Sequence, residues 1–417
     1  MRVLMTTLAQ ASHYYSQVPL AWALRAAGHE VRVASQPMLT DDILTSGLPA
    51  VPVGTDHVLQ QMRQDLAMAG NVSFPKMYEE RDEPPTWADA LDFEILTTAL
   101  MLMAANNDTM VDGLVSYARS WRPDLVISEP YTYAGGIAAA ACGAAHTRLL
   151  WGLDAPGSAR KVFNELRDQQ PEQHREDPVA EWLTWTAARY DVPFGDHLIT
   201  GHWTIDPLPE SLRLPVGVPT LGMRYIPYNG RSVIPDWLLE PPRKPRVCLT
   251  LGLSGRDFMG ADPFSPAELV EAMADLDIEL VATLSGAQRE GLEKVPDNTR
   301  IVDFVPLQAL LPTCRATVHH GGFGSVGGAL INGVPQITIA DMWDTPVKGR
   351  MIENQGAGLF FRPERMSAQI VREGVQRLLD EPSFADNAAR LRGELLAEPT
   401  PAALVAELER LTDEHRS

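Results

Sequence analysis

The chain has 417 residues, 45% of them hydrophobic, which is enough for two domains with separate cores. The formal net charge of −19 argues against nucleic acid or an anionic membrane as the main partner, since both require basic surfaces. Three widely spaced cysteines, and the absence of any apolar run near about 18 residues, predict a cytoplasmic protein without a disulfide framework, a zinc site or a membrane span.

A β-loop-α-β unit opens the chain. Met1 to Thr7 form an apolar run typical of a strand, and Val31 to Ala34 predict the next one. Between them, Val18 to Ala27 show the apolar spacing of a helix, with Gly28 as its C-cap. The loop after the first strand carries His13, at the carboxyl end where α/β domains form ligand sites. From position alone, a solvated loop histidine is the simpler interpretation.

The rest of the first half contains one clear strand. Residues His57 to Ala118 predict helices and loops that would shape an acceptor pocket. Pro123 to Ser128 predict a buried parallel strand, and Glu129 follows at its carboxyl end. The small-residue segment Gly135 to Ala145 suits a helix packed closely on the sheet.

A proline-rich segment separates the two halves. Residues 226–245 are dense in proline with polar and charged residues between, which predicts a linker. Arg246 to Leu251 then begin a second α/β domain, and Ser254 lies in the small-residue loop that follows this strand. The predicted organisation is a first domain, a linker, a second domain and a C-terminal helix that crosses back onto the first domain, at 1–225, 226–245, 246–395 and 396–417.

The most informative stretch runs from Ala316 to Thr345. A β-branched run leads to a histidine pair, a glycine-rich turn and the start of a helix, at His319, His320, Gly321, Gly322, Gly324 and Ser325. Glycines let the backbone approach a ligand, and a helix start directs free N–H groups and partial positive charge at it. A histidine at the strand end can donate to a phosphate oxygen. This stretch therefore predicts a phosphate site.

The same stretch also fits a dinucleotide motif. Gly322 to Gly327 match G-x-G-x-x-G, and Asp341 or Asp344 lies near the spacing of a ribose-binding acid. Taken alone, this pattern would indicate an NAD(P)-dependent oxidoreductase. A dinucleotide fold is, however, expected to open its Rossmann unit with the motif, whereas about three quarters of this chain precede it.

The order of residues resembles a different family. His319-His320-Gly321-Gly322, then Pro335, then Asp341-x-x-Asp344-Thr345 resemble the donor-binding signature of the GT-B glycosyltransferases. The segments HYYSQVPLAWALRAAGHEVRVAS, RYIPYNGRSVIPDWL and FVPLQALLPTCRATVHHGGFGSVGGALINGVPQITIADMWDTPVKGRMIENQGAGL extend the similarity over almost the whole chain. Together they resemble the actinobacterial glycosyltransferases of macrolide and anthracycline biosynthesis, especially TDP-aminosugar transferases of the desosaminyl, mycaminosyl and vicenisaminyl type.

This resemblance implies a fold, a reaction and partners. The fold would be α/β of the GT-B type, with two Rossmann-like domains facing a cleft. The reaction would be inverting transfer of a deoxysugar, an aminosugar, from a TDP-sugar to a hydroxyl of a polyketide aglycone, without a metal or other cofactor. A helper protein resembling a haem-less cytochrome P450 would dock on Val58 to Ala118, and a homodimer is a further expectation. A catalytically silent GT-B accessory protein is the alternative, against which the presence of His13 and His320 counts.

The resemblance also assigns donor-binding roles, mainly in the second domain. His320 would bind the pyrophosphate, next to His319 and Gly321, with N–H donors at Gly322, Gly324 and Ser325. The backbone of Val305 would pair with thymine, and Ser254 would lie on the donor side. Gly328 stands where plant UDP-sugar relatives place a glutamate on the ribose hydroxyls, which suits a 2′-deoxyribose.

The remaining roles concern the sugar and the acceptor. Asp344 and Thr345 replace an Asp-Gln or Glu-Gln pair, which suits a sugar that has lost hydroxyls. His13 matches the proposed general base, which would take the proton of the acceptor hydroxyl while the pyrophosphate departs. Glu129 is the candidate carboxylate that orients this base, although a structural role is equally open.

Overall fold

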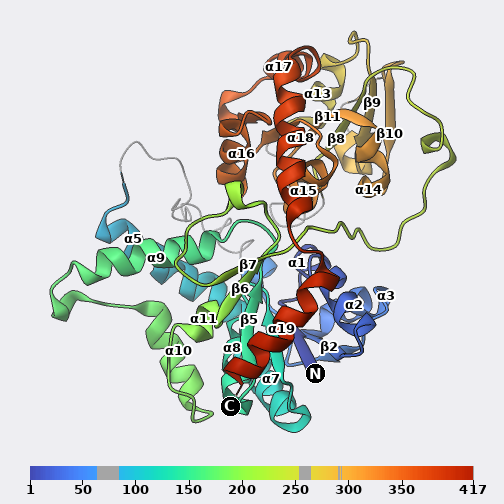
Figure 1. The fold of residues 1–417 in the computed structure, drawn as a ribbon. Helices are drawn as coiled ribbons and strands as arrows, with labels where there is room; N and C mark the ends of the chain where they lie inside the picture. The colour runs from blue at the N-terminus through green and yellow to red at the C-terminus, as the bar shows by residue number, and fades with distance from the viewer. Residues whose placement is uncertain (63–83, 253–263, 290–291, 293, 417) are drawn as a thin grey trace. The chain divides into compact units, whose positions relative to one another are not determined.

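The computed structural model describes residues 1–62, 84–252, 264–289, 292 and 294–416, which form two units (Figure 1). Unit 1 comprises Met1–Pro207, Arg213–Met223 and Pro399–Ser417, and unit 2 comprises Leu208–Leu212 and Arg224–Glu398. Each unit contains a parallel sheet flanked by helices, which confirms the α/β class. Residues 226–245, for which the sequence predicts a linker, belong to unit 2.

The described strands of unit 1 form one parallel sheet in the order β3-β2-β1-β4-β5-β6-β7. Their bounds are β1 Arg2–Thr6, β2 Glu30–Ser35, β3 Ala50–Pro52, β4 Leu125–Ser128, β5 Ala145–Leu149, β6 Trp203–Asp206 and β7 Thr220–Gly222. Every residue of β4, β5 and β6 is buried, as expected for central strands with both faces covered. The order reverses between β1 and β4, so their carboxyl ends meet at a topological switch point.

Helices flank this sheet (Figure 1). They are α1 Ala11–Tyr15, α2 Val18–Ala26, α3 Thr40–Thr45, α5 Trp87–Thr97, α6 Met103–Ala105, α7 Asp108–Trp121, α8 Tyr133–Cys142, α9 Ala155–Asp168, α10 Pro178–Ala188, α11 His197–Thr200 and α19 Pro401–His415, with a π-helix at Thr98–Leu102 and 3-10 turns at Pro37–Leu39 and Glu172–His174. The C-terminal helix α19 packs on α2 and β5. A contact of His29 Nε2 with Glu409 Oε1 (3.0 Å) and an ion pair of Arg416 with Asp124 (2.9 Å) hold it there. The last helix thus returns to the first domain, as the sequence predicts.

Unit 2 repeats this plan with the strand order β10-β9-β8-β11-β12-β13. Its strands are β8 Arg246–Thr250, β9 Glu279–Thr283, β10 Thr299–Val302, β11 Cys314–His319, β12 Gln336–Ile339 and β13 Gly358–Phe361. Its helices are α13 Pro266–Ala272, α14 Leu307–Leu310, α15 Phe323–Asn332, α16 Thr345–Asn354, α17 Ala368–Asp380 and α18 Pro382–Ala397, with 3-10 turns at Glu210–Leu212, Asp236–Leu238, Gly286–Arg289, Leu311–Thr313 and Pro363–Arg365. The switch point of this sheet lies between β8 and β11.

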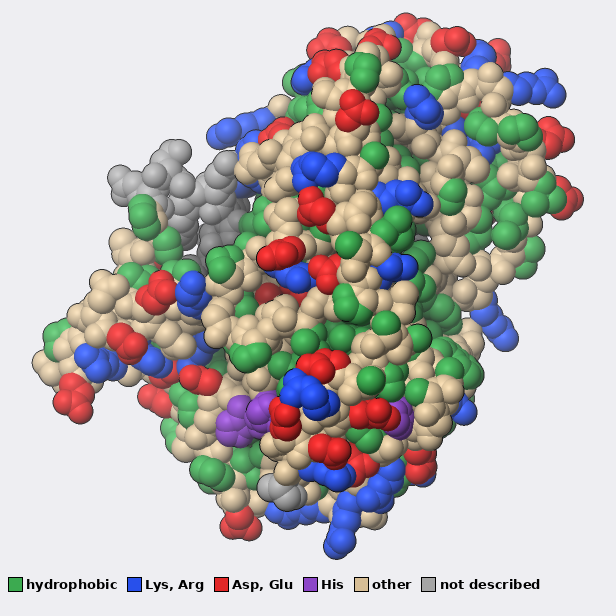
Figure 2. All heavy atoms as spheres, in the orientation of Figure 1, with side chains coloured by type: hydrophobic (Ala, Val, Ile, Leu, Met, Phe, Trp, Pro, Cys, Tyr) green, Lys and Arg blue, Asp and Glu red, His purple; other side chains and the backbone are tan. Residues whose placement is uncertain are grey.

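The charge distribution and the length of the helices can be read from the structure. Figure 2 shows acidic and basic side chains interspersed over the face drawn. No helix in the described ranges combines the length and the apolar character needed to cross a bilayer.

Candidate active site

His13 lies just past the carboxyl end of β1. It belongs to the short helix α1, and not to a loop as the sequence suggested. The turn before this helix is held by the buried Gln36, whose Oε1 accepts a hydrogen bond from the Ala9 N–H at 2.8 Å. The His13 side chain is 17% exposed, so its ring remains within reach of a ligand.

Glu129 follows β4, the strand next to β1, and faces His13. Its Oε2 lies 3.3 Å from His13 Nδ1, slightly longer than an ordinary N–H···O hydrogen bond. Thr132 Oγ1 donates to Glu129 Oε1 at 2.5 Å, and Trp151 Nε1 donates to Oε2 at 2.9 Å. The structure therefore brings together the two residues that the sequence nominates as base and partner, inside a shell that the sequence analysis missed.

The surroundings of Glu129 favour its charged form. Burial opposes ionisation, but the hydrogen bond and charge of His13, followed by the hydrogen bonds of Thr132 and Trp151, outweigh burial and lower the pKa of Glu129. A carboxylate can only accept, so a neutral His13 that donates to Glu129 must do so from Nδ1, which leaves the lone pair on Nε2. That arrangement can take a proton from a hydroxyl.

The predicted strand-loop-helix of unit 2 consists of β11, a glycine turn and α15. Gly321 has φ of 83°, a conformation that favours glycine. Gly322 is the N-cap of α15 and has no side chain to cap the first N–H groups of the helix. Gly324 is exposed on the first turn, and a Cβ there would meet nothing within 4 Å. This open helix start can bind an anion.

His320 lies beside this helix start, between two glycine backbones. A Cβ on Gly252 would lie 2.3 Å from its Cε1, and a Cβ on Gly322 would lie 2.4 Å from its Nε2. Burial, followed by the charges of His319 and Lys348, lowers the pKa of His320 to about 3. The ring is therefore neutral at physiological pH and can offer one N–H to a phosphate oxygen.

His319 has a different role in the same turn. It is fully buried, with Nε2 at 2.8 Å from Gln336 Oε1 and Nδ1 accepting the Gly321 N–H at 3.1 Å. Burial lowers the pKa of His319 to about 4. Both ring nitrogens thus have partners inside the protein, so we assign His319 to the support of the turn and not to direct contact with the donor.

Asp344 and Thr345 stand at the start of α16. Asp344 is buried and pairs with the buried Lys348, with 2.8 Å between Oδ2 and Nζ. The Thr345 hydroxyl donates to the Met342 carbonyl, and a Cβ on Gly321 would lie 2.9 Å from Thr345 Cβ. The pair therefore adjoins the phosphate turn. The sequence analysis missed Lys348, although its i, i+4 spacing from Asp344 was a usable signal.

Three further nominated positions are Val305, Gly328 and Ser254. The Val305 side chain is buried in a core cluster with Val281 and Leu310, so only its backbone can meet a base. Gly328 is buried, and a Cβ there would lie 2.8 Å from Leu311 Cδ1, so close packing is one reason for this glycine. Ser254 lies outside the described residues.

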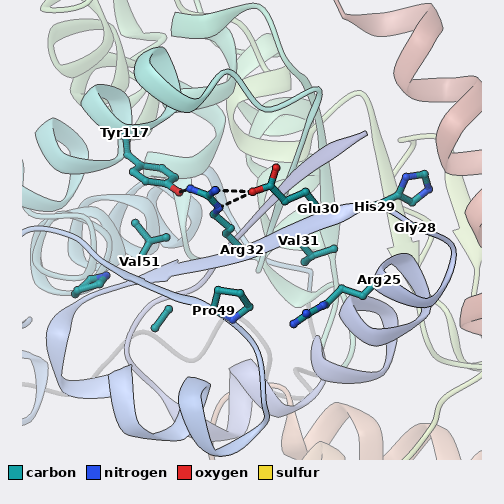
Figure 3. Close-up of a pocket in the computed structure, with 11 residues that line it drawn as sticks. Arg25, Gly28, His29, Glu30, Val31, Arg32, Pro49, Val51 and Tyr117 are labelled. Carbon is teal, nitrogen blue, oxygen red and sulfur yellow. Dashed lines mark hydrogen bonds and ion pairs between the residues drawn. The ribbon is translucent and has the colours of Figure 1, made fainter.

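An open groove of about 760 Å³ lies elsewhere in unit 1, at the start of β2 and along β3 (Figure 3). Arg32 crosses it, bound to Glu30 and to the Tyr117 hydroxyl. None of the nominated site residues lines this groove, so it is not assigned to the reaction. Within the described ranges, no three His, Cys, Asp or Glu side chains come together as a metal site.

Family models and curated relatives match the chain over nearly its full length. Erythromycin biosynthesis protein CIII-like models match as an N-terminal domain over residues 22–252 and as a C-terminal domain over residues 267–411. The 10-deoxymethynolide desosaminyltransferase of Streptomyces venezuelae is 57% identical over 418 residues, covering 100% of this chain and 98% of that protein. The tylactone mycaminosyltransferase of Streptomyces fradiae is 51% identical over 423 residues, covering 100% and 94%.

Solved glycosyltransferase structures match the fold of the chain over nearly its full length. The crystal structure of glycosyltransferase VinC in complex with dTDP matches with a TM-score of 0.89 and 41% identity, covering 99% of this chain and 100% of that one. Spinosyn forosaminyltransferase SpnP matches with a TM-score of 0.84 and 38% identity, covering 99% of each chain. These similarities favour a glycosyltransferase over an oxidoreductase or an accessory protein. The chain therefore belongs to the erythromycin biosynthesis protein CIII-like family of GT-B glycosyltransferases.

Proposed function

We propose that this enzyme moves an aminodeoxysugar from TDP to a hydroxyl of a macrolide-type polyketide aglycone, with inversion at the anomeric carbon. One observation carries the proposal: a chain similar throughout to a desosaminyltransferase has a His–Glu pair at one switch point and a glycine-rich helix start at the other. The first suits an acceptor hydroxyl and the second suits a pyrophosphate.

The proposed step is an in-line displacement. His13 Nε2 takes the hydroxyl proton as the acceptor oxygen bonds to the anomeric carbon, and the bond from that carbon to the TDP oxygen breaks with its electron pair. His320 and the first N–H groups of α15 stabilise the negative charge that develops on the departing diphosphate. Asp344, Thr345 and Lys348 would face the sugar, and the backbone of Val305 would face the thymine. The proposal assigns stabilisation of the diphosphate to His320 and the N–H groups of α15, and requires no metal.

Partners beyond donor and acceptor rest on the family resemblance alone. We propose that a P450-like helper raises activity by docking on residues 58–118, a region that includes 63–83 and so lies partly outside the described residues. A homodimer is the oligomeric state to test, by light scattering with and without the helper.

The test is product formation. The purified enzyme, with and without the helper, is incubated with TDP-desosamine or TDP-mycaminose and with 10-deoxymethynolide or tylactone, and products are read by mass spectrometry. We expect a glycoside from at least one pairing, formed equally well with EDTA present. Turnover of UDP-hexoses with none of the TDP-aminosugars would contradict the proposed donor class.

A further inference from the structure

One side chain touches both members of the His–Glu pair. The indole of Trp151 stacks on the His13 imidazole, with ring centroids 3.9 Å apart and planes 18° apart. Its Nε1–H also donates to Glu129 Oε2, the oxygen that faces His13 Nδ1. Trp151 follows β5, so the three residues come from the ends of three adjacent strands.

We propose that Trp151 is the positioning residue of the base, fixing at once the plane of the His13 ring and the carboxylate oxygen that orients it. This proposal deepens the proposed function and rests on His13 being the base. An imidazole turns easily about its last torsion, because that torsion has broad wells. A parallel indole at 3.9 Å confines the ring to one plane, and the Glu129 contact selects which edge points inward.

The carboxylate is confined in turn. Thr132 occupies Glu129 Oε1, and Trp151 shares Oε2 with His13, so Glu129 cannot rotate away without losing a hydrogen bond. The arrangement leaves Nε2 as the nitrogen available to the acceptor hydroxyl.

The stack also favours the product of proton transfer. When Nε2 takes the hydroxyl proton, the imidazole becomes a cation lying on the face of an indole, which is the most favourable aromatic surface for a cation. Thr132 contacts Glu129 but makes no ring contact with His13, so Thr132 and Trp151 are expected to differ in their effect on the rate.

The experiment is a double-mutant cycle read by single-turnover rates at saturating donor. Trp151→Leu removes the stack and the N–H, and should lower the rate about 10–10²-fold, on the scale of a misplaced catalytic group. Trp151→Phe keeps an aromatic face, and its rate should stay within about tenfold of the wild-type rate. Thr132→Val is the matched control, expected to change the rate less than Trp151→Leu. Thermal unfolding and TDP affinity, measured for each variant, identify a folding defect.

The decisive measurement is the effect of the Trp151 substitutions in the His13→Ala background. There, Trp151→Leu and Trp151→Phe should cause no further loss, because the group that Trp151 positions is absent. An equal loss in both backgrounds would overturn the proposal, as would a wild-type rate in Trp151→Leu. If Trp151→Leu does not fold, the small effect of Trp151→Phe must still vanish in the His13→Ala background. Failure of the proposed function is distinct, since it appears as absent glycoside with the wild-type enzyme.

Discussion

The two units place histidines at the same topological position and surround them differently. At the switch point of unit 1, His13 faces the buried and ionised Glu129. At that of unit 2, His319 and His320 adjoin a Gln336 amide, glycine backbones and the charge of Lys348, and their pKa values fall to about 4 and 3. A carboxylate beside an imidazole orients the ring through a hydrogen bond, whereas burial beside a cation keeps an imidazole uncharged and able to donate one N–H.

This difference teaches that the neighbours of a histidine, and not its place in the fold, decide its role. Both units offer the crevice that open parallel sheets form where strand order reverses. Unit 1 fills it with side chains that handle a proton, and unit 2 fills it with glycines and N–H groups that receive an anion. The predictions below test that division.

The largest expected effect is on the rate of sugar transfer. His13→Ala should lower kcat by about 10²–10⁴-fold, the usual contribution of general base catalysis, measured as single-turnover rate with TDP-sugar saturating. His174→Ala, at an exposed histidine of the same unit, is the matched control and should keep the wild-type rate. A His13→Ala enzyme with more than about a tenth of the wild-type rate would show that another group supplies the base.

The next effect is on donor binding. His320→Ala removes a donor from the diphosphate and should weaken TDP binding by about 1.5–3 kcal/mol, the scale of hydrogen bonds to charged groups, measured by calorimetry. Unchanged affinity would remove His320 from the donor site and leave the helix start as the only anion contact.

The depressed histidine pKa values predict acid sensitivity. A folded histidine with lowered pKa stays neutral while its unfolded counterpart, with an ordinary pKa of about 6.5, takes up a proton. The contribution of the neutral His319 and His320 to the free energy of unfolding is therefore complete above about pH 6.5. It is lost as the pH falls toward about 4. The unfolding temperature should drop between pH 7 and 5, and His319→Gln should reduce that drop. Glu94, whose pKa burial raises to about 7, acts in the opposite direction. A flat profile, identical in both proteins, would contradict the assignment.

The smallest effect concerns the nucleoside. TDP should bind a few-fold more tightly than UDP, because Gly328 offers no partner to a ribose 2′-hydroxyl. The expected difference in binding free energy is about 0.5–1.5 kcal/mol, the scale of one hydrogen bond. Calorimetry with both nucleotides decides this. Equal affinity would mean that packing against Leu311 alone explains the glycine.

The sequence predicted the fold where local patterns are clear. The stretch around His319 and His320 has unmistakable strand, turn and helix chemistry, and the structure differs there only in starting α15 at Phe323, two residues before Ser325. In contrast, β5 was not predicted, and only its first residue, Ala145, falls at the end of the helix predicted for Gly135 to Ala145. Its sequence, AHTRL, carries a His and an Arg, and reads as a buried strand only because Asp154 neutralises Arg148 in the fold.

The sequence nominated the candidate site residue by residue but did not indicate the contacts among those residues. Missing β5 hid Trp151, because only the strand order brings the end of β5 beside Glu129. His319 was nominated with its neighbour because adjacent residues look equivalent in a sequence. His319 ends β11 and is buried against Gln336, whereas His320 lies just past the strand and remains partly exposed.

The division between the two switch points is tested most directly by the TDP dissociation constant of His13→Ala, measured by calorimetry beside wild type and His320→Ala. The account predicts that His13→Ala binds TDP as wild type does, while its transfer rate collapses. If His13→Ala instead lost TDP affinity as severely as His320→Ala, His13 would belong to the donor site, and the assignment of proton transfer to one unit and anion binding to the other would be contradicted.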